Sequence, residues 1–256
     1  MIIRKSPEEL QKMRRAGRIT GDAISKALEA AIPGASTFNL DQIAEEYILD
    51  QGATSSFKGY GGHGQPPFPA VSCISLNDEV VHGIPSDRKI EEGDLLSFDF
   101  GCIWEGFHGD SAVTVFVGGE APSEEAARLV TATERSLYAG IAAAQPGGRL
   151  SDIGSAIESV ADPERLGIIR EYGGHGIGRS MHEDPFISNF GKPGRGPDLR
   201  PGLVLAIEPM FTLAGEETRT LDDAWTVVTA DGSLSAHFEH TVAITEDGPE
   251  ILTARG

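Results

Sequence analysis

The feature that most restricts how this chain can fold is a weak internal repeat. Residues 93–99 (GDLLSFD) align with residues 202–208 (GLVLAIE), and residues 108–110 (HGD) align with residues 237–239 (HFE). Each aligned segment ends on an acidic residue, and a β-rich tail follows the second segment in both copies. The repeat predicts two similar halves that pack about a pseudo-twofold axis and bring their acids together.

Helix and strand signals occur in the same order in both halves. Ser6-Pro7-Glu8-Glu9 is typical of a helix start, and Pro33-Gly34 and Pro146-Gly147 each end one predicted helix and introduce another. The predicted helices cover about residues 6–33, 39–50, 123–146 and 151–160. The predicted strands cover about residues 70–76, 95–104, 108–117, 202–208, 224–229 and 237–245, and a loop rich in glycine, proline and aromatic residues covers most of 52–78.

Composition excludes several classes of protein. The 256 residues include 39 acidic and 21 basic ones, a net charge of −18, which argues against DNA binding because phosphate contacts need clustered cations. No segment approaches the twenty or so apolar residues of a membrane span, and Arg4 and Lys5 interrupt any secretory signal. Two cysteines, Cys73 and Cys102, fit a reducing compartment, so we expect a cytoplasmic protein.

The four acids that end the repeated segments predict a metal centre. They are Asp99, Asp110, Glu208 and Glu239. Asp99 and Glu208 lie in apolar strand-like segments, where an uncompensated charge is costly. No Lys or Arg occurs within residues 95–104 or 202–212, so ion-pair partners would have to come from elsewhere. Two divalent cations would cancel the four negative charges, as in two-metal hydrolases.

A glycine-rich segment, residues 173–185 (GGHGIGRSMHEDP), supplies candidate imidazoles. His175 and His182 are seven residues apart, which is not the spacing of the helical His-Glu-x-x-His zinc motif. Glycine lets backbone approach a site closely, so we expect a loop that brings a histidine to the metals. Carboxylates with one imidazole suit manganese, iron, cobalt or zinc.

Six ordered segments together resemble type I methionine aminopeptidases over nearly the whole chain. They are residues 76–85 (LNDEVVHGIP), Asp99 with Asp110, residues 174–178 (GHGIG), His182-Glu183, residues 207–210 (IEPM) and residues 235–241 (SAHFEHT). The resemblance implies the pita-bread fold, an α/β (α+β) fold in which helices flank a central antiparallel sheet built from two pseudo-symmetric halves. We expect one catalytic domain, residues 1–256, with halves of about 1–118 and 119–256. Only 31 positions separate the last two glutamates, too few for the helical insertion of type II enzymes.

The resemblance also implies a role for each site residue. The metal ligands would be Asp99, Asp110, His175, Glu208 and Glu239, holding two divalent ions such as Co, Mn, Fe, Zn or Ni. Asp110 and Glu239 would bridge the ions, and a bridging hydroxide would attack the first peptide bond. The catalytic residues would be Glu208 as proton shuttle, His182 as donor to the carbonyl oxygen and His82 at the scissile nitrogen. The substrate-binding residues would be His82, His182, Tyr60, Phe68, Cys73, Met181 and Trp225, the last five forming the methionine pocket.

The expected activity is removal of the initiator methionine from nascent proteins with a small second residue. Two alternatives remain open: an X-Pro peptidase of the same fold, and a pita-bread binding protein without catalysis. We expect a monomer that meets nascent chain ends, with no membrane partner. The basic cluster between Arg4 and Arg18 is a candidate for ribosome docking.

Overall fold

The computed structural model of the protein describes residues 2–62 and 64–255, so His63 of the predicted loop lies outside the described residues. The helices are α1 (Pro7–Glu29), α2 (Thr37–Asp50), α3 (Glu124–Ala143) and α4 (Leu150–Glu164). The strands are β1 (Thr54–Ser55), β2 (Ser72–Leu76), β3 (Glu79–Val81), β4 (Leu95–Trp104), β5 (Phe107–Phe116), β6 (Gly167–Ile168), β7 (Gly174–Gly176), β8 (Glu183–Ile187), β9 (Val204–Ile207), β10 (Met210–Thr212), β11 (Thr218–Thr220), β12 (Val227–Thr229), β13 (Ser235–His237), β14 (Glu239–Thr245) and β15 (Gly248–Ile251).

One antiparallel sheet joins the two halves of the chain. Within residues 2–62 and 64–255 its main path runs β1-β4-β5-β14-β9-β7-β8, while β2 pairs with β4 and β15 pairs with β14. The halves meet where β5 pairs with β14, with Ala112 opposite Glu239. The strands that carry the repeat, β4 and β5 against β9 and β14, stand symmetrically about this seam. The internal repeat therefore corresponds to real structural symmetry in the sheet.

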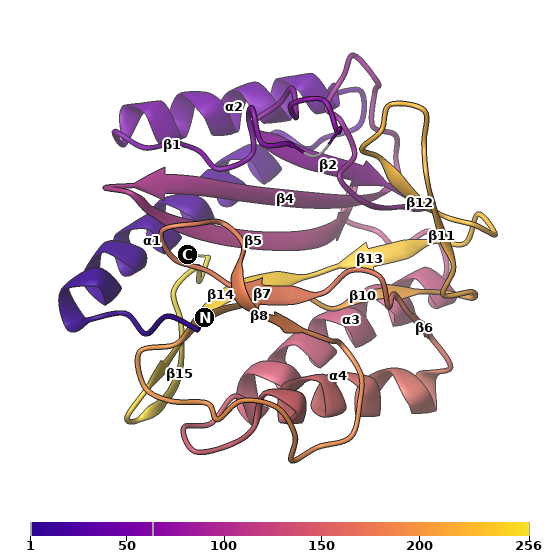
Figure 1. Ribbon diagram of the computed structural model, residues 1–256. Helices are drawn as coiled ribbons and strands as arrows, with labels where there is room; N and C mark the ends of the chain where they lie inside the picture. Colours follow the sequence, from indigo (N-terminus) through magenta and orange to yellow (C-terminus); the bar gives the residue numbers. More distant parts are fainter. Residues whose placement is uncertain (1, 63, 256) are drawn as a thin grey trace.

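Each pair of helices covers its own half of the sheet (Figure 1). Helix α1 contacts β4 and β5 and α2 contacts β2, whereas α3 contacts β9, β13 and β14, and α4 contacts β8. Large apolar side chains such as Phe98, Phe100 and Leu40 are fully buried between these layers. The predicted combination of a central antiparallel sheet with flanking helices is confirmed.

The helix starts follow the capping rules. Ser6 accepts the backbone N–H of Glu9, and the Glu9 carboxylate accepts the backbone N–H of Ser6, a capping box followed by Pro7. Ser36 accepts the N–H of Asn39, so α2 begins two residues before the predicted position. The first helix of each half ends shortly before the predicted proline, α1 before Pro33 and α3 before Pro146, in agreement with the sequence.

Two of the predicted strands are interrupted, one by a polar turn and the other by a change of sheet. In the segment 224–229, Ala224 has a positive φ of 65°, and Asp223 accepts the N–H groups of Trp225 and Thr226, so β12 begins only at Val227. The segment 237–245 divides at Phe238, because β13 pairs with β10 whereas β14 pairs with β5 and β9. The chain thus changes sheets between His237 and Glu239.

The glycine-rich segment expected as a loop contains two short paired strands at its ends, a correction to the sequence prediction, and residues 177–182 form the loop between them. β7 pairs with β9 and with β8, and it carries His175. A side chain at Gly174 would collide with the carbonyl of Ala206, and one at Gly176 with the carbonyl of Asp184. The glycines therefore permit close strand pairing around His175 rather than loop flexibility.

Candidate metal centre

The five predicted metal ligands come from five neighbouring strands of the sheet. In the strand order β4-β5-β14-β9-β7 they are Asp99, Asp110, Glu239, Glu208 and His175, with Glu208 directly after β9. Asp99 lies opposite Ala112 of β5, and Ala112 lies opposite Glu239. His175 lies opposite Ala206 of β9. Sheet pairing alone therefore gathers side chains that are up to 140 positions apart in the sequence.

The side chains meet at distances that suit a shared cation. Ligand-type atoms of Asp110, His175 and Glu239 all lie within 4.8 Å of one another. His175 Nε2 lies 3.7 Å from Glu208 Oε1, and His237 Nε2 lies 3.6 Å from Glu208 Oε2. Asp110 and Glu239 are 3% and 2% exposed, so water cannot screen their charges. An arrangement of this kind requires positive charge in the middle.

Hydrogen bonding does not supply that compensation. Across the described part of the chain, Asp99 Oδ1, Asp110 Oδ1 and Glu239 Oε1 are buried and have no hydrogen-bond partner. Removal from water raises the pKa of Asp99 to about 7 and that of Glu208 to about 8. Burial and the neighbouring carboxylates raise the pKa of Asp110 and of Glu239 well above the usual range. Divalent cations would satisfy these oxygens, so the donor set fits a metal site.

His175 is prepared to act as a neutral ligand. Burial lowers its pKa to about 3, with a further contribution from neighbouring His182. Its Nδ1 lies 2.9 Å from the carbonyl oxygen of Gly176, so Nδ1 carries the proton and donates. That tautomer leaves the lone pair of Nε2 for a metal ion.

His182 lies beside His175 in the turn between β7 and β8. The ring centroids of the two histidines are 4.2 Å apart. His182 Nδ1 lies 2.8 Å from the hydroxyl oxygen of Tyr60, which is 44% exposed at the cavity mouth. Burial lowers the pKa of His182, so the imidazole is neutral at pH 7. A hydroxyl that donates to Nδ1 leaves the proton on Nε2.

His82 approaches the same cavity from the opposite side. It follows β3 with a positive φ of 62°, an uncommon conformation for a residue other than glycine. Its ring lies edge-on to Tyr172 and to Trp225, with centroids 5.7 and 6.0 Å away. Removal from water, with smaller effects of His237 and His182, lowers the pKa of His82 to about 4.

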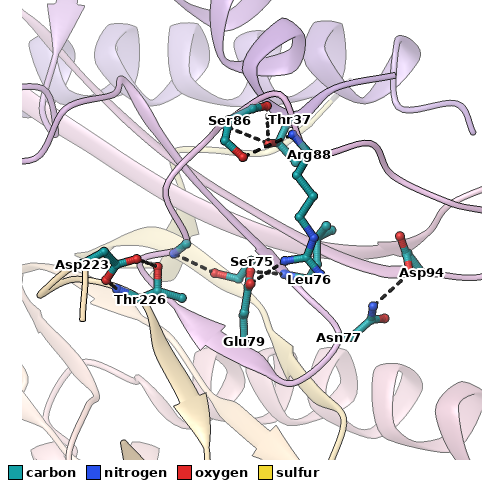
Figure 2. A network of polar contacts seen from close by, with 11 residues as sticks. Thr37, Ser75, Leu76, Asn77, Glu79, Ser86, Arg88, Asp94, Asp223 and Thr226 are labelled. Atoms are coloured by element: carbon teal, nitrogen blue, oxygen red, sulfur yellow. Dashed lines mark hydrogen bonds and ion pairs between the residues drawn. The ribbon is translucent and has the colours of Figure 1, made fainter. Parts of the chain in front are cut away.

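Polar contacts hold the β3 segment that presents His82. The N–H of Gly83 donates to Ser75 Oγ at 3.1 Å, and Glu79 accepts both the N–H of Leu76 and the guanidinium of Arg88. Figure 2 shows Glu79 between these two donors, with Ser75 beside them. Hydrogen bonds thus hold the chain both before and after the strained residue.

All twelve predicted site residues line one cavity of about 290 Å³. Its apolar end consists of Phe68, Cys73 and Trp225, each at most 6% exposed, with Met181 packed against them. Trp225 Nε1 donates to the carbonyl of Pro66 at 3.1 Å, and the Phe68 and Trp225 rings meet edge-to-face at 5.2 Å. Side chains from both sequence halves therefore close a small apolar pocket beside the metal ligands.

Sequence reasoning missed several residues of the site. Phe57, Gln65, Tyr172, Thr220 and Val227 also line the cavity. Tyr172 directly precedes the glycine-rich segment, and His237 aligns with His108 in the repeat, so both positions carried a signal. The repeat did not predict that His237 would lie against Glu208, because only the sheet change at Phe238 brings it there.

The comparisons with known proteins agree with this geometry. The model of metallopeptidase family M24 matches residues 11–246. A methionine aminopeptidase of Clostridium perfringens is 49% identical over 253 residues, covering 99% of both chains, and methionine aminopeptidase 1 of Mycobacterium tuberculosis is 51% identical, covering 99% of this chain and 95% of that one. The crystal structure of a methionine aminopeptidase from Thermotoga maritima, 41% identical, superposes with a TM-score of 0.94 and covers both chains completely.

More distant structures share the fold alone. Prolidase from Pyrococcus furiosus is 23% identical with a TM-score of 0.78, and the match covers 99% of this chain but 66% of the prolidase. The predicted pita-bread fold and the predicted resemblance to methionine aminopeptidases are both confirmed. The chain therefore belongs to metallopeptidase family M24.

Proposed function

We propose that this protein is a metal-dependent aminopeptidase that removes the initiator methionine from new polypeptides whose second residue is small. The observation that carries the proposal is that ligand-type side chains of β4, β5, β14 and β7, with Glu208 directly after β9, line the same cavity as the apolar cluster of Phe68, Cys73 and Trp225. Methionine aminopeptidases about 50% identical over their full length support the same conclusion. The predicted single domain, with halves meeting near residue 118, is consistent with the continuous sheet.

The metal would be held by the five buried ligands. Asp99, Asp110, His175, Glu208 and Glu239 would together hold divalent cations, and four carboxylates carry enough negative charge for two of them. Cobalt, manganese, iron, zinc or nickel would each suit this donor set. When bound, such ions polarise a substrate carbonyl and lower the pKa of water to near neutrality.

The chain's own residues perform the remaining steps. Glu208, which lines the cavity directly after β9, exchanges the proton between attacking water and leaving amine. His182 donates from Nε2 to the carbonyl oxygen as negative charge develops there. His82 contacts the nitrogen of the scissile bond and assists its departure. The unbranched side chain of methionine fits the pocket formed by Phe68, Cys73, Trp225, Met181 and Tyr60.

A panel of peptides tests the reaction and its specificity together. Metal-stripped protein reloaded with manganese or cobalt should release methionine from Met-Ala-Ser and should leave Ala-Pro-Ser intact. Faster cleavage of the proline peptide would favour the X-Pro alternative. Binding of metal without cleavage of either peptide would favour a non-catalytic protein.

Two substitutions separate the proposed roles. Asp99→Asn should lower the metal content and reduce kcat, because one ligand loses its charge. His182→Ala should reduce kcat about a hundredfold with metal content unchanged, the typical loss of one donor to a developing oxyanion. Equal metal loss in both variants would contradict this division of roles.

The expected setting of the activity is the cytoplasm, where new polypeptides emerge. Within the described residues, no helix combines the length and apolar composition of a membrane span. Ribosome docking through the basic cluster remains a proposal, and part of that cluster is already paired with acidic side chains. Arg14 makes a bidentate ion pair with Glu250 and Lys12 pairs with Glu105, so their charges are already compensated. A monomeric state also remains a prediction.

A further inference from the structure

Lys5 is a buried lysine outside the proposed catalytic groups. Its side chain is 3% exposed, and its Nζ lies 2.7 Å from Glu183 Oε2, whose own side chain is 7% exposed. The backbone N–H of Lys5 donates to the carbonyl of Gly202 at 2.7 Å, which fixes the segment that precedes α1. Burial of a lysine in this way is rare and demands a partner.

The partner, Glu183, holds a loop of the candidate active site. We define the His182 loop as residues 178–182, between β7 and β8. Glu183 Oε1 accepts the N–H of Arg179 at 2.9 Å and the N–H of Ser180 at 3.2 Å. One carboxylate therefore joins the N-terminal segment to the His182 loop, and Figure 1 shows that segment passing close to β8.

The contact between Lys5 and the His182 loop is closely fitted. A Cβ on Gly178 would collide with the Lys5 stem and with the Glu183 carboxylate. The carbonyl of Gly178 accepts the N–H of His108 at 2.8 Å, so the start of the loop is also fixed to the beginning of β5. These contacts hold the first residues of the loop, and His182 at its last position lies beside His175 and Tyr60.

Stability alone is a weak explanation for this ion pair. Removing two charges from water costs much of what their attraction returns, and apolar replacements of buried pairs are often neutral or stabilising. A fixed geometry is a stronger one, because a displacement of about 1 Å in a catalytic group can lower turnover a hundredfold.

We propose that Lys5 is a positioning residue of the active site: its ion pair with Glu183 fixes the His182 loop and thereby the place of His182 beside the metal ligands. This inference rests on the proposed role of His182 as donor to the substrate carbonyl. Lys5 acts through Glu183 and the loop backbone, and it contacts no substrate.

The first test compares Lys5→Met with Lys12→Met, a matched control in which an exposed lysine loses its pairing with Glu105. With saturating manganese and Met-Ala-Ser, Lys5→Met should lower kcat about tenfold to a hundredfold, with KM and metal content unchanged. Hydrogen exchange of residues 178–182 in the metal-free protein should be at least tenfold faster. Lys12→Met should match the unmodified protein in every measurement.

A double-mutant cycle distinguishes positioning from a merely structural role. If Lys5 acts through His182, its replacement should cause no further loss of kcat in a His182→Ala background. Should Lys5→Met fold poorly, Lys5→Met/Glu183→Gln removes both buried charges and keeps an oxygen for the two loop N–H groups. That variant should show the same loss of kcat and the same dependence on His182.

Unchanged kcat and unchanged loop exchange in both Lys5 variants would overturn the inference. An equally large loss of kcat in the His182→Ala background would also overturn it, because the ion pair would then act on the whole fold. If His182→Ala itself keeps full turnover, the proposed role of His182 is wrong, and the inference falls with it. If His182→Ala loses turnover as expected but the Lys5 variants keep full activity, the inference about Lys5 is wrong. The proposed role of His182 is then unaffected.

Discussion

Buried acids of this protein fall into two kinds at the scale of single residues. Asp41 Oδ1 accepts three hydrogen bonds, from the N–H groups of Val71 and Ser72 and from Ser72 Oγ. Asp99 Oδ1 and Asp110 Oδ1 are equally removed from water but accept none within the described residues. A carboxylate with its donors in place is structural, whereas one that lacks them requires a cation. The lack of hydrogen-bond donors therefore distinguishes Asp99, Asp110 and Glu239, three of the proposed metal ligands, from a structural acid such as Asp41.

The strained conformation of His82 leads to a prediction about Ser75. In Ser75→Ala the N–H of Gly83 remains buried without its acceptor, which should destabilise the protein by about 1–3 kcal/mol. The segment after β3 would then release His82 from its positive φ, and kcat/KM for Met-Ala-Ser should fall about tenfold. Urea unfolding and steady-state kinetics measure both effects.

Ser86→Ala is the matched control for Ser75→Ala. Ser86 is exposed, and its hydroxyl accepts the N–H of Arg88 in the same network (Figure 2). Its loss should change stability by less than about 0.5 kcal/mol and leave turnover unchanged. Full activity of Ser75→Ala would show that Ser75 does not position His82.

At the scale of elements, glycines occur where helix α1 packs too closely against its neighbours for a side chain to fit. Gly17 of α1 lies where a Cβ would contact the carbonyl of Leu252 in the C-terminal segment. On the other side, a Cβ on Gly109 of β5 would lie 2.8 Å from the backbone nitrogen of Gly17. Helix α1 therefore lies directly against β5, one residue before Asp110. Packing of a helix that is remote from the cavity thus fixes the backbone of a proposed metal ligand.

Gly17→Ala should lower the free energy of unfolding, whereas a glycine-to-alanine change inside a helix usually raises it. In an open position alanine gains about 1 kcal/mol over glycine, but here the added methyl group meets backbone that cannot move aside. We expect a net loss of about 1–3 kcal/mol in urea unfolding. In the control Gly140→Ala, the methyl group meets side-chain atoms of Ile157 and Ile153 and no backbone, so the loss should be smaller. Equal stability of Gly17→Ala and the parent would contradict this packing argument.

The sequence predicted elements well where local signals and burial agree. β4 has the predicted bounds, residues 95–104, because its apolar run pairs on both sides. β7 was not predicted, since three residues rich in glycine form a strand only through partners elsewhere in the chain. The sequence also did not predict that the segment 237–245 divides into two strands between His237 and Glu239, because the division depends on which sheet each part joins. The repeat predicted that the four acids would lie together, whereas Phe57, Gln65 and Thr220 of the cavity wall depend on long-range packing that the sequence does not show.

At the scale of the whole molecule, the sheet seam concentrates negative charge. Ligand-type atoms of Asp110 and Glu239 lie within 4.8 Å of each other at the junction of the halves, and Asp99 and Glu208 add to them from the neighbouring strands. Assembly of the two halves is therefore opposed by the same carboxylates that the proposed chemistry requires. Cations at the seam would convert this repulsion into attraction between the halves.

Metal binding should accordingly govern the stability of the entire fold. A chelator should lower Tm, and added manganese at a hundred times its Kd should restore about 2.7 kcal/mol of stability.

Asp110→Asn should change Tm in opposite directions in the metal-free and in the manganese-bound protein. Without metal, burial of Asp110 requires either an uncompensated charge or the uptake of a proton at a cost set by its raised pKa, and asparagine requires neither, so the variant should unfold at a higher temperature than the parent protein. With manganese present it lacks a bridging ligand, so the parent should become the more stable of the two. Calorimetric scans of both proteins with chelator and with manganese measure this crossing. A Ser86→Ala control should follow the parent in both conditions, and a lower Tm of Asp110→Asn in chelator would contradict the charge-repulsion argument.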